Sequence, residues 1–91
     1  MLSLRKRRQL YAALSTTLRA GLPLAAVLGP KFPSLALRDG ESLTDALARS
    51  GQLPEDELAI LAVGEASGNL DGCAALLAEH CLLYTSPSPR D

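Results

Sequence analysis

The sequence predicts an all-α protein, a small antiparallel bundle of helices. Apolar residues recur at spacings of three and four, the period of one helix face. Glycines and prolines divide the chain into segments of helical length, and no segment alternates apolar and polar residues as a strand would. With 91 residues, 47% of them hydrophobic, the chain has the size of one small domain.

The first predicted helix lies in the N-terminal part of the chain and ends at Gly21. Four apolar residues share one of its faces: Leu10, Tyr11, Leu14 and Leu18. Gly21 suits the position just after a helix, and Pro23 follows it. A short helical piece is expected over 23–28. Residues 29–33 are expected to form a loop, because two prolines remove backbone donors there.

Ser42 is predicted to begin the second helix. Its hydroxyl can cap the amide of Asp45, whose carboxylate can reach back in a capping box. Leu43 and Leu47 then share a face, and Gly51 ends the helix.

Two further helices are predicted after Gly51. Pro54 suits the first turn of the third helix. Three acids next to it favour the positive end of the helix dipole: Glu55, Asp56 and Glu57. Gly68 ends this helix, and Asn69 is the expected N-cap of the last one. The expected buried residues of these two helices are Leu58, Leu61, Ala62, Leu70, Ala74, Leu77 and Ala78. Connections of two to four residues imply antiparallel neighbours.

The last eleven residues, 81–91, differ abruptly in composition from the helix before them. Read back into codons, they resemble at all eleven positions the transposon-end adapter used in sequencing libraries. A native tail rich in Ser and Pro is the alternative. On the first interpretation, residues 1–80 are the native domain, 81–91 are a non-native, disordered tail, and the reading frame continues past His80. Cys73 is then the one native cysteine.

Charge is divided between the two parts of the chain. Residues 1–38 hold seven bases and no acid, whereas residues 39–80 hold nine acids and one base. Mutual attraction between the two halves is favoured over a dedicated partner site. Four residues at the front of the first helix are the candidate contact for an anionic surface, lipid or nucleic acid: Arg5, Lys6, Arg7 and Arg8. A solvated helix start is the alternative.

The sequence offers no constellation for catalysis or for a cofactor. Ser67 has no local histidine to form a nucleophile pair, and His80 is interpreted as a surface helix residue. Glu65 lacks a second metal ligand at helical spacing, so we expect it to accept a hydrogen bond from a nearby amide or from Ser67. We therefore predict a protein that is not an enzyme and has no cofactor, metal or small-molecule substrate.

Small residues near the last two helices are interpreted as structural. Cys73 is expected to be a small core residue. Gly64 and Gly68 have the spacing of a close helix contact followed by a C-cap. The sequence has no uncharged apolar run of 18 residues, the length that crosses a membrane.

Three segments, in order along the chain, resemble the type II secretion system protein F family. Residues 64–71 read Gly-Glu-Ala-Ser-Gly-Asn-Leu-Asp, the most distinctive segment of the chain, and resemble the family's hallmark. Residues 10–24 are similar to its opening helix, which ends in Ala-Gly-Leu-Pro-Leu, and residues 39–47 to its Gly-x-Ser-Leu-x-x-Ala-Leu segment. The residues that carry the motifs are Gly21, Pro23, Gly40, Ser42, Leu43, Gly64, Glu65, Ser67, Gly68, Asn69 and Leu70. In two places the chain departs from the family: residues 24–39 are fewer than usual, and Gly72 stands where many members carry Glu.

The resemblance implies part of a cytoplasmic helical domain of a platform protein in the bacterial inner membrane. Such a protein serves type II secretion or type IV pilus assembly and is not itself a catalyst. The domain would couple an assembly ATPase to the insertion of pilin-like subunits. The implied partners are that ATPase, other inner-membrane platform components, a further copy of the chain, and the membrane through helices missing from this fragment. The alternative, from another class, is a small nucleic-acid-binding module that uses the basic residues 5–8.

Overall fold

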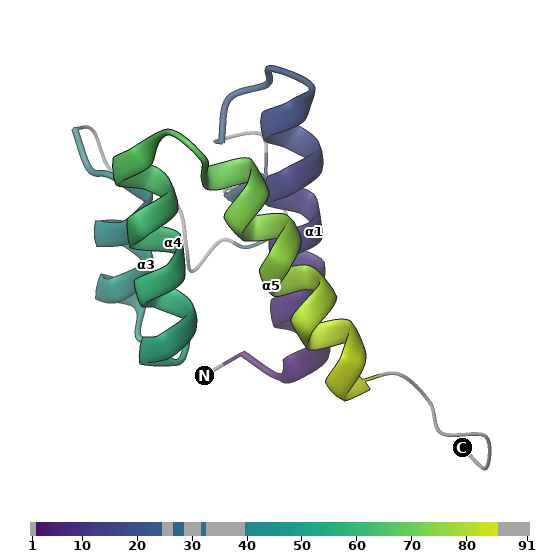
Figure 1. Ribbon diagram of the computed structural model, residues 1–91. Coiled ribbons are helices and arrows are strands. Elements are labelled where there is room, and N and C mark those ends of the chain that lie inside the picture. The colour runs from purple at the N-terminus through teal and green to yellow at the C-terminus, as the bar shows by residue number, and fades with distance from the viewer. Residues whose placement is uncertain (1, 25–26, 29–31, 33–39, 86–91) are drawn as a thin grey trace, which may run out of the picture.

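The computed structural model describes residues 2–24, 27–28, 32 and 40–85 (Figure 1). Its helices are α1 (Leu4–Arg19), α3 (Leu43–Ser50), α4 (Glu55–Ser67) and α5 (Leu70–Thr85). No strand occurs among these residues, which confirms the predicted all-α class. Helix α5 packs most extensively on α1 and also contacts α4, and α3 packs on α4. Because a short turn joins them, α4 and α5 run in opposite directions (Figure 1).

Helix α1 ends as its sequence predicts. Gly21 has a φ of +75°, in the left-handed region that favours glycine. Its amide donates to the carbonyl of Leu18 at 3.1 Å, and the amide of Leu22 donates to the carbonyl of Thr17 at 3.0 Å. These two bonds form a Schellman motif, which satisfies carbonyls that would otherwise lack partners at the helix end.

The segment after α1 is described only in part. Val27 and Leu28 are helical, as expected for 23–28, and both amides donate to the carbonyl of Leu24. Residues 25 and 26 lie outside the described residues. Of the expected loop 29–33, the structure describes Phe32 alone, and that side chain is buried.

Helices α3 and α4 begin at different kinds of residue. Ser42 is the N-cap of α3, as predicted, and its hydroxyl accepts the amide of Asp45 at 3.1 Å. Gly51, in the left-handed conformation, ends that helix. The prediction for Pro54 was wrong by one position. It is the N-cap of α4 instead of a first-turn residue, and its ψ of 151° is extended. The N-cap position also needs no N–H donor, so proline fits there as well.

A close approach of backbones shapes the antiparallel pair α4 and α5. Gly68, with a φ of +77°, ends α4, and the carbonyl of Asn69 accepts the first regular bond of α5 from the amide of Cys73 at 3.0 Å. A Cβ on Gly64 would lie 2.8 Å from Sγ and 2.9 Å from Cβ of Cys73. The interpretation of Gly64 and Gly68 as a packing contact and a C-cap is therefore confirmed.

Helix α5 extends into the segment that was expected to be disordered. It runs to Thr85, and Cys81 is fully buried. The expectation of disorder is therefore wrong for residues 81–85, because Cys81 lies one turn after Leu77 and continues its buried face. Residues 86–91 lie outside the described part. The resemblance of 81–91 to an adapter concerns the origin of the codons and stays a prediction.

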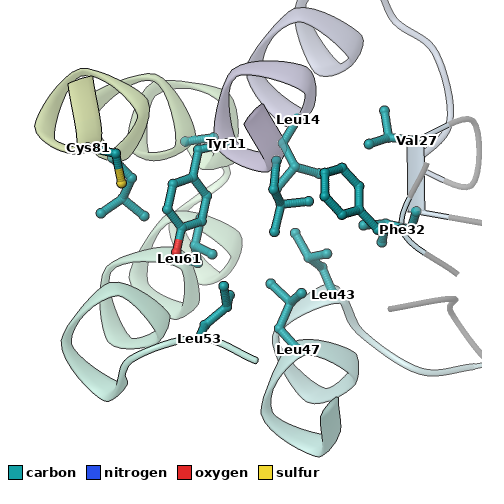
Figure 2. Close-up of a cluster of buried hydrophobic side chains, with 13 residues drawn as sticks. Tyr11, Leu14, Val27, Phe32, Leu43, Leu47, Leu53, Leu61 and Cys81 are labelled. Carbon is teal, nitrogen blue, oxygen red and sulfur yellow. The ribbon is translucent and has the colours of Figure 1, made fainter. Parts of the chain in front are cut away.

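The hydrophobic core draws side chains from every described helix (Figure 2). Its labelled members in Figure 2 are Tyr11, Leu14, Val27, Phe32, Leu43, Leu47, Leu53, Leu61 and Cys81. Several residues predicted to be inside are fully or almost fully buried: Leu10, Tyr11, Leu14, Leu43, Leu47, Leu61, Ala74 and Leu77. The others are half-buried: Leu18, Leu58, Ala62, Leu70 and Ala78.

A buried carboxylate connects α4 to α1. Glu57 accepts a hydrogen bond from Nε of Arg7 at 3.0 Å and another from the hydroxyl of Tyr11 at 2.5 Å. The side chains of the ion pair are only 13% and 6% exposed. The pKa of Tyr11 is raised above its usual value, first by burial and then by the hydrogen bond to Glu57 and the negative charge of Glu57. The phenol therefore stays protonated and continues to donate.

We predict that Arg7→Leu lowers the free energy of unfolding by about 3 kcal/mol, because it leaves Glu57 buried without a cation. Arg7→Leu combined with Glu57→Gln should recover much of that loss, since Gln carries no charge and still offers Tyr11 an acceptor. Urea unfolding followed by circular dichroism measures both variants. A double variant no more stable than Arg7→Leu alone would contradict this role of the ion pair.

Candidate functional site

Two of the motif segments meet where α3 begins against α4. Glu65, on α4, accepts the amide of Leu43 at 2.9 Å through Oε2. Its Oε1 accepts the amide of Thr44 at 3.2 Å and the hydroxyl of Thr44 at 2.6 Å. One carboxylate thus binds the first two residues of α3, which lie 22 and 21 positions earlier in the chain.

The first turn of α3 has its backbone donors satisfied. Glu65 accepts hydrogen bonds from the amides of Leu43 and Thr44, and the hydroxyl of Ser42 accepts one from the amide of Asp45. The amide of Ala46 then begins the regular pattern by donating to the carbonyl of Ser42 at 3.0 Å. A helix start leaves such amides without partners inside the helix, and its dipole attracts negative charge. Glu65 and Ser42 together accept these amides, and Glu65 also places a negative charge at the helix start.

The carboxyl of Glu65 is held in its charged form. Burial alone would raise its pKa, but hydrogen bonds from the hydroxyl and amide of Thr44 and the amide of Leu43 outweigh burial. The pKa therefore lies below the ordinary value of 4.5. Because these donors stabilise only the carboxylate, Glu65 is an anion at neutral pH.

The sequence-based prediction for Glu65 is half correct. It is hydrogen-bonded to amides, as expected, but these belong to another helix and not to its own turn. Ser67 does not bind it: its hydroxyl donates to the carbonyl of Gly64 at a long 3.4 Å. A local pattern contains no signal for a partner 22 residues away.

The remaining motif residues lie at helix ends and turns. Gly40 precedes α3, and Gly64, Gly68, Asn69 and Leu70 surround the turn from α4 to α5. Gly21 and Pro23 follow α1, whose Arg19 reaches Asp71 of α5 at 3.8 Å between Nε and Oδ2. The motif residues therefore start, stop and pack helices.

The basic cluster at the front of α1 does not form one free surface. Arg5 and Lys6 are exposed. Arg7 is turned inward, where it binds Glu57 and donates to the carbonyl of Leu2 at 2.7 Å. Arg8 is half-buried, and its Nε is buried with no hydrogen-bond partner among the described residues. Of the four residues of the candidate anionic contact, Arg5 and Lys6 are therefore exposed, whereas Arg7 shares the helix face of the core.

The two oppositely charged halves attract each other in the fold. Arg7 pairs with Glu57 and Arg19 pairs with Asp71, each across the boundary between the halves. These two ion pairs are contacts of the kind that mutual attraction between the halves predicts. A further pair, Arg49 with Glu41 at 2.9 Å, lies within the acidic half.

The histidine and both cysteines of the chain lie on α5. His80 is exposed on α5, and Cys73 and Cys81 are not joined in a disulfide. Burial is the main cause that raises the pKa of Cys81. Over the described ranges, no three of His, Cys, Asp and Glu are placed to hold a metal ion. None of the helices described is both long and apolar enough for a membrane crossing.

Comparisons with protein-family models, with curated proteins and with solved structures find no match for this chain. The resemblance to the type II secretion system protein F family therefore remains a hypothesis based on the motif residues.

We predict that Glu65→Gln lowers the free energy of unfolding by about 1 kcal/mol at pH 7, because it removes the charge that binds the start of α3. The folded-state pKa of Glu65 is depressed, so its stabilisation is present above pH 4.5 and is lost as pH falls through that lower pKa. The difference in the free energy of unfolding between the wild-type chain and Glu65→Gln should therefore shrink below pH 4.5. Urea unfolding from pH 7 to pH 3 measures it.

Glu79→Gln is the matched control, since Glu79 is an exposed carboxylate on α5. It should leave stability within about 0.5 kcal/mol of the wild-type value. If Glu65→Gln behaves like this control at every pH, the carboxylate does not hold α3.

Proposed function

We propose that this chain is part of a cytoplasmic helical domain of a platform protein of the type II secretion system protein F type. On this proposal, the domain faces the cytoplasm at the bacterial inner membrane, in a machine for type II secretion or type IV pilus assembly. It is not an enzyme. It connects an assembly ATPase and other platform components to membrane helices that lie outside this sequence.

The observation that carries the proposal is the bond between the two motif segments. Glu65 of the 64–71 segment caps the helix that begins in the 39–47 segment. The types of residue in both motifs then have a physical explanation: a glycine where helices touch, a serine at an N-cap and a carboxylate at a helix start. Motifs of this kind maintain a shape, which is what a coupling domain requires.

The proposed mechanism is mechanical. Glu57 attaches α4 to α1, Glu65 attaches α3 to α4, and Gly64 lets α5 approach α4 closely. A force applied by a partner to one helix is then passed to the others because their relative positions are fixed by buried contacts. Such a domain moves as one body against the membrane components.

Among the described residues, the front of α1 offers few exposed cations to the alternative of a nucleic-acid-binding module. Each phosphate contact lowers the logarithm of the binding constant by roughly 0.9 per logarithm of salt concentration. Arg5 and Lys6 are the exposed members of the basic cluster, whereas Arg7 is occupied by Glu57. If both cations contact phosphates, the logarithm of the binding constant falls with the logarithm of salt concentration with a slope of about −1.8, which is typical of weak binding.

Reading the source gene onward from the codon of His80, on DNA prepared without an adapter, tests the proposal. We predict an open frame that reaches about 20 consecutive apolar residues within a few tens of positions, because a platform domain must join a membrane helix. A stop codon, or a polar continuation with no such stretch, would contradict the platform proposal.

A further inference from the structure

Among the residues of α4 and α5 whose side chains the structure describes, three large apolar ones are exposed. Ile60 is 41% exposed, Val63 66% and Leu76 64%. They border two adjoining hollows between the helices, which share Ile60 as a wall. The first, of about 260 Å³, is also lined by Asp56, Leu76 and His80. The second, of about 250 Å³, is also lined by Val63 and Cys73. We call these two hollows the α4–α5 groove.

The spacing of the wall residues matches the docking of a helix. On α4, Asp56, Ile60 and Val63 follow one another at i, i+4 and i+7, so they form one stripe along two turns. On α5, Leu76 lies three residues after Cys73 and four before His80, which forms the facing stripe. Two turns span roughly 10 Å, and an amphipathic helix in such a groove is anchored at the same spacing.

Acidic side chains flank the groove on both helices. Asp56 lines it directly, Glu55 lies one turn before Ala59 of the same wall, and Glu79 lies three residues after Leu76. All three carboxylates are exposed, and no cation of the described residues is within ion-pair distance of them. A second copy that docked the same face would bring acids against acids, which is unfavourable. A partner with positive charges beside its apolar stripe is complementary.

We propose that the α4–α5 groove docks an amphipathic helix of a partner protein, with its apolar stripe in the groove and Lys or Arg residues on both flanks. The inference uses only the described faces of α4 and α5, so it does not rest on the platform proposal. It assigns a second role to these helices, whose other faces build the core.

The test uses the 91-residue chain and two fluorescein-labelled 14-residue peptides. Both peptides carry Leu at i, i+3, i+4, i+7 and i+11, and their flanking residues are Lys in one and Glu in the other. Fluorescence anisotropy should show binding of the Lys peptide with a Kd at least about tenfold lower than that of the Glu peptide. Val63→Ser and Leu76→Ser should each weaken binding of the Lys peptide about tenfold. Asp56→Asn should reduce the ratio between the Kd of the Glu peptide and the Kd of the Lys peptide.

Leu22→Ser is the matched control, because Leu22 is a similarly exposed apolar residue, 53% exposed, after the end of α1. It should leave the Kd unchanged. Circular dichroism confirms that each variant keeps its helix content, which is expected because the altered side chains are exposed. Equal binding of the two peptides, or binding that Val63→Ser and Leu76→Ser leave intact, would overturn the proposal. So would a dimer of the chain that these two variants abolish, since a second copy would then occupy the groove.

Discussion

The carboxylate of Glu65 fixes the position of α3, and the shape of the domain depends on that position. Helix α3 has eight residues, fewer than the length at which a helix is stable by itself in water. It is held by its apolar face, which buries Leu43, Ala46 and Leu47, and by the cap that Glu65 places on its first amides. Packing of these side chains sets which face of α3 lies inward, and the directional hydrogen bonds to its first turn add a restraint along the helix axis.

Helix α4 serves as the common support of the bundle. At one end Glu57 receives Arg7 and Tyr11 from α1, and at the other end Glu65 receives the start of α3. The two carboxylates are eight residues apart, so they lie on different turns and bind different neighbours. Between them, Gly64 brings α5 close. These contacts with α1, α3 and α5 leave the side chains of Ile60 and Val63 exposed, and those two residues border the groove with α5.

Much of this arrangement was predictable from local sequence. The caps at Ser42, Gly51 and Gly68 depend on residues three or four positions away, and all three agree with the prediction. The buried stripes of α1 and α5 follow a period that sequence displays directly. The continuation of α5 to Thr85 was missed because the change in composition after His80 outweighed the position of Cys81, one turn beyond Leu77.

The site was less predictable, because its bonds join residues far apart in the chain. A signal for the Glu57 pair was present: Arg7 precedes Leu10 and Tyr11 on one stripe, and Glu57 precedes Leu61 on another. A charge placed in line with core residues indicates a buried partner of opposite sign. For Glu65 the signal is weaker, since two of its partners are the backbone amides of Leu43 and Thr44, a group that every residue except proline has, and the third is the hydroxyl of Thr44.

Hydrogen exchange of single amides is the most direct test of the Glu65 cap. The first amides of a helix normally exchange fast, because no residue of the helix accepts from them. Helix α4 provides the internal reference, since Pro54 gives Glu55 and Asp56 no side-chain cap. The account predicts that the amides of Leu43 and Thr44 are protected about tenfold or more relative to those of Glu55 and Asp56 at pH 6. Equal and fast exchange at all four amides would show that Glu65 does not bind α3, and the link between the two motif segments would be lost.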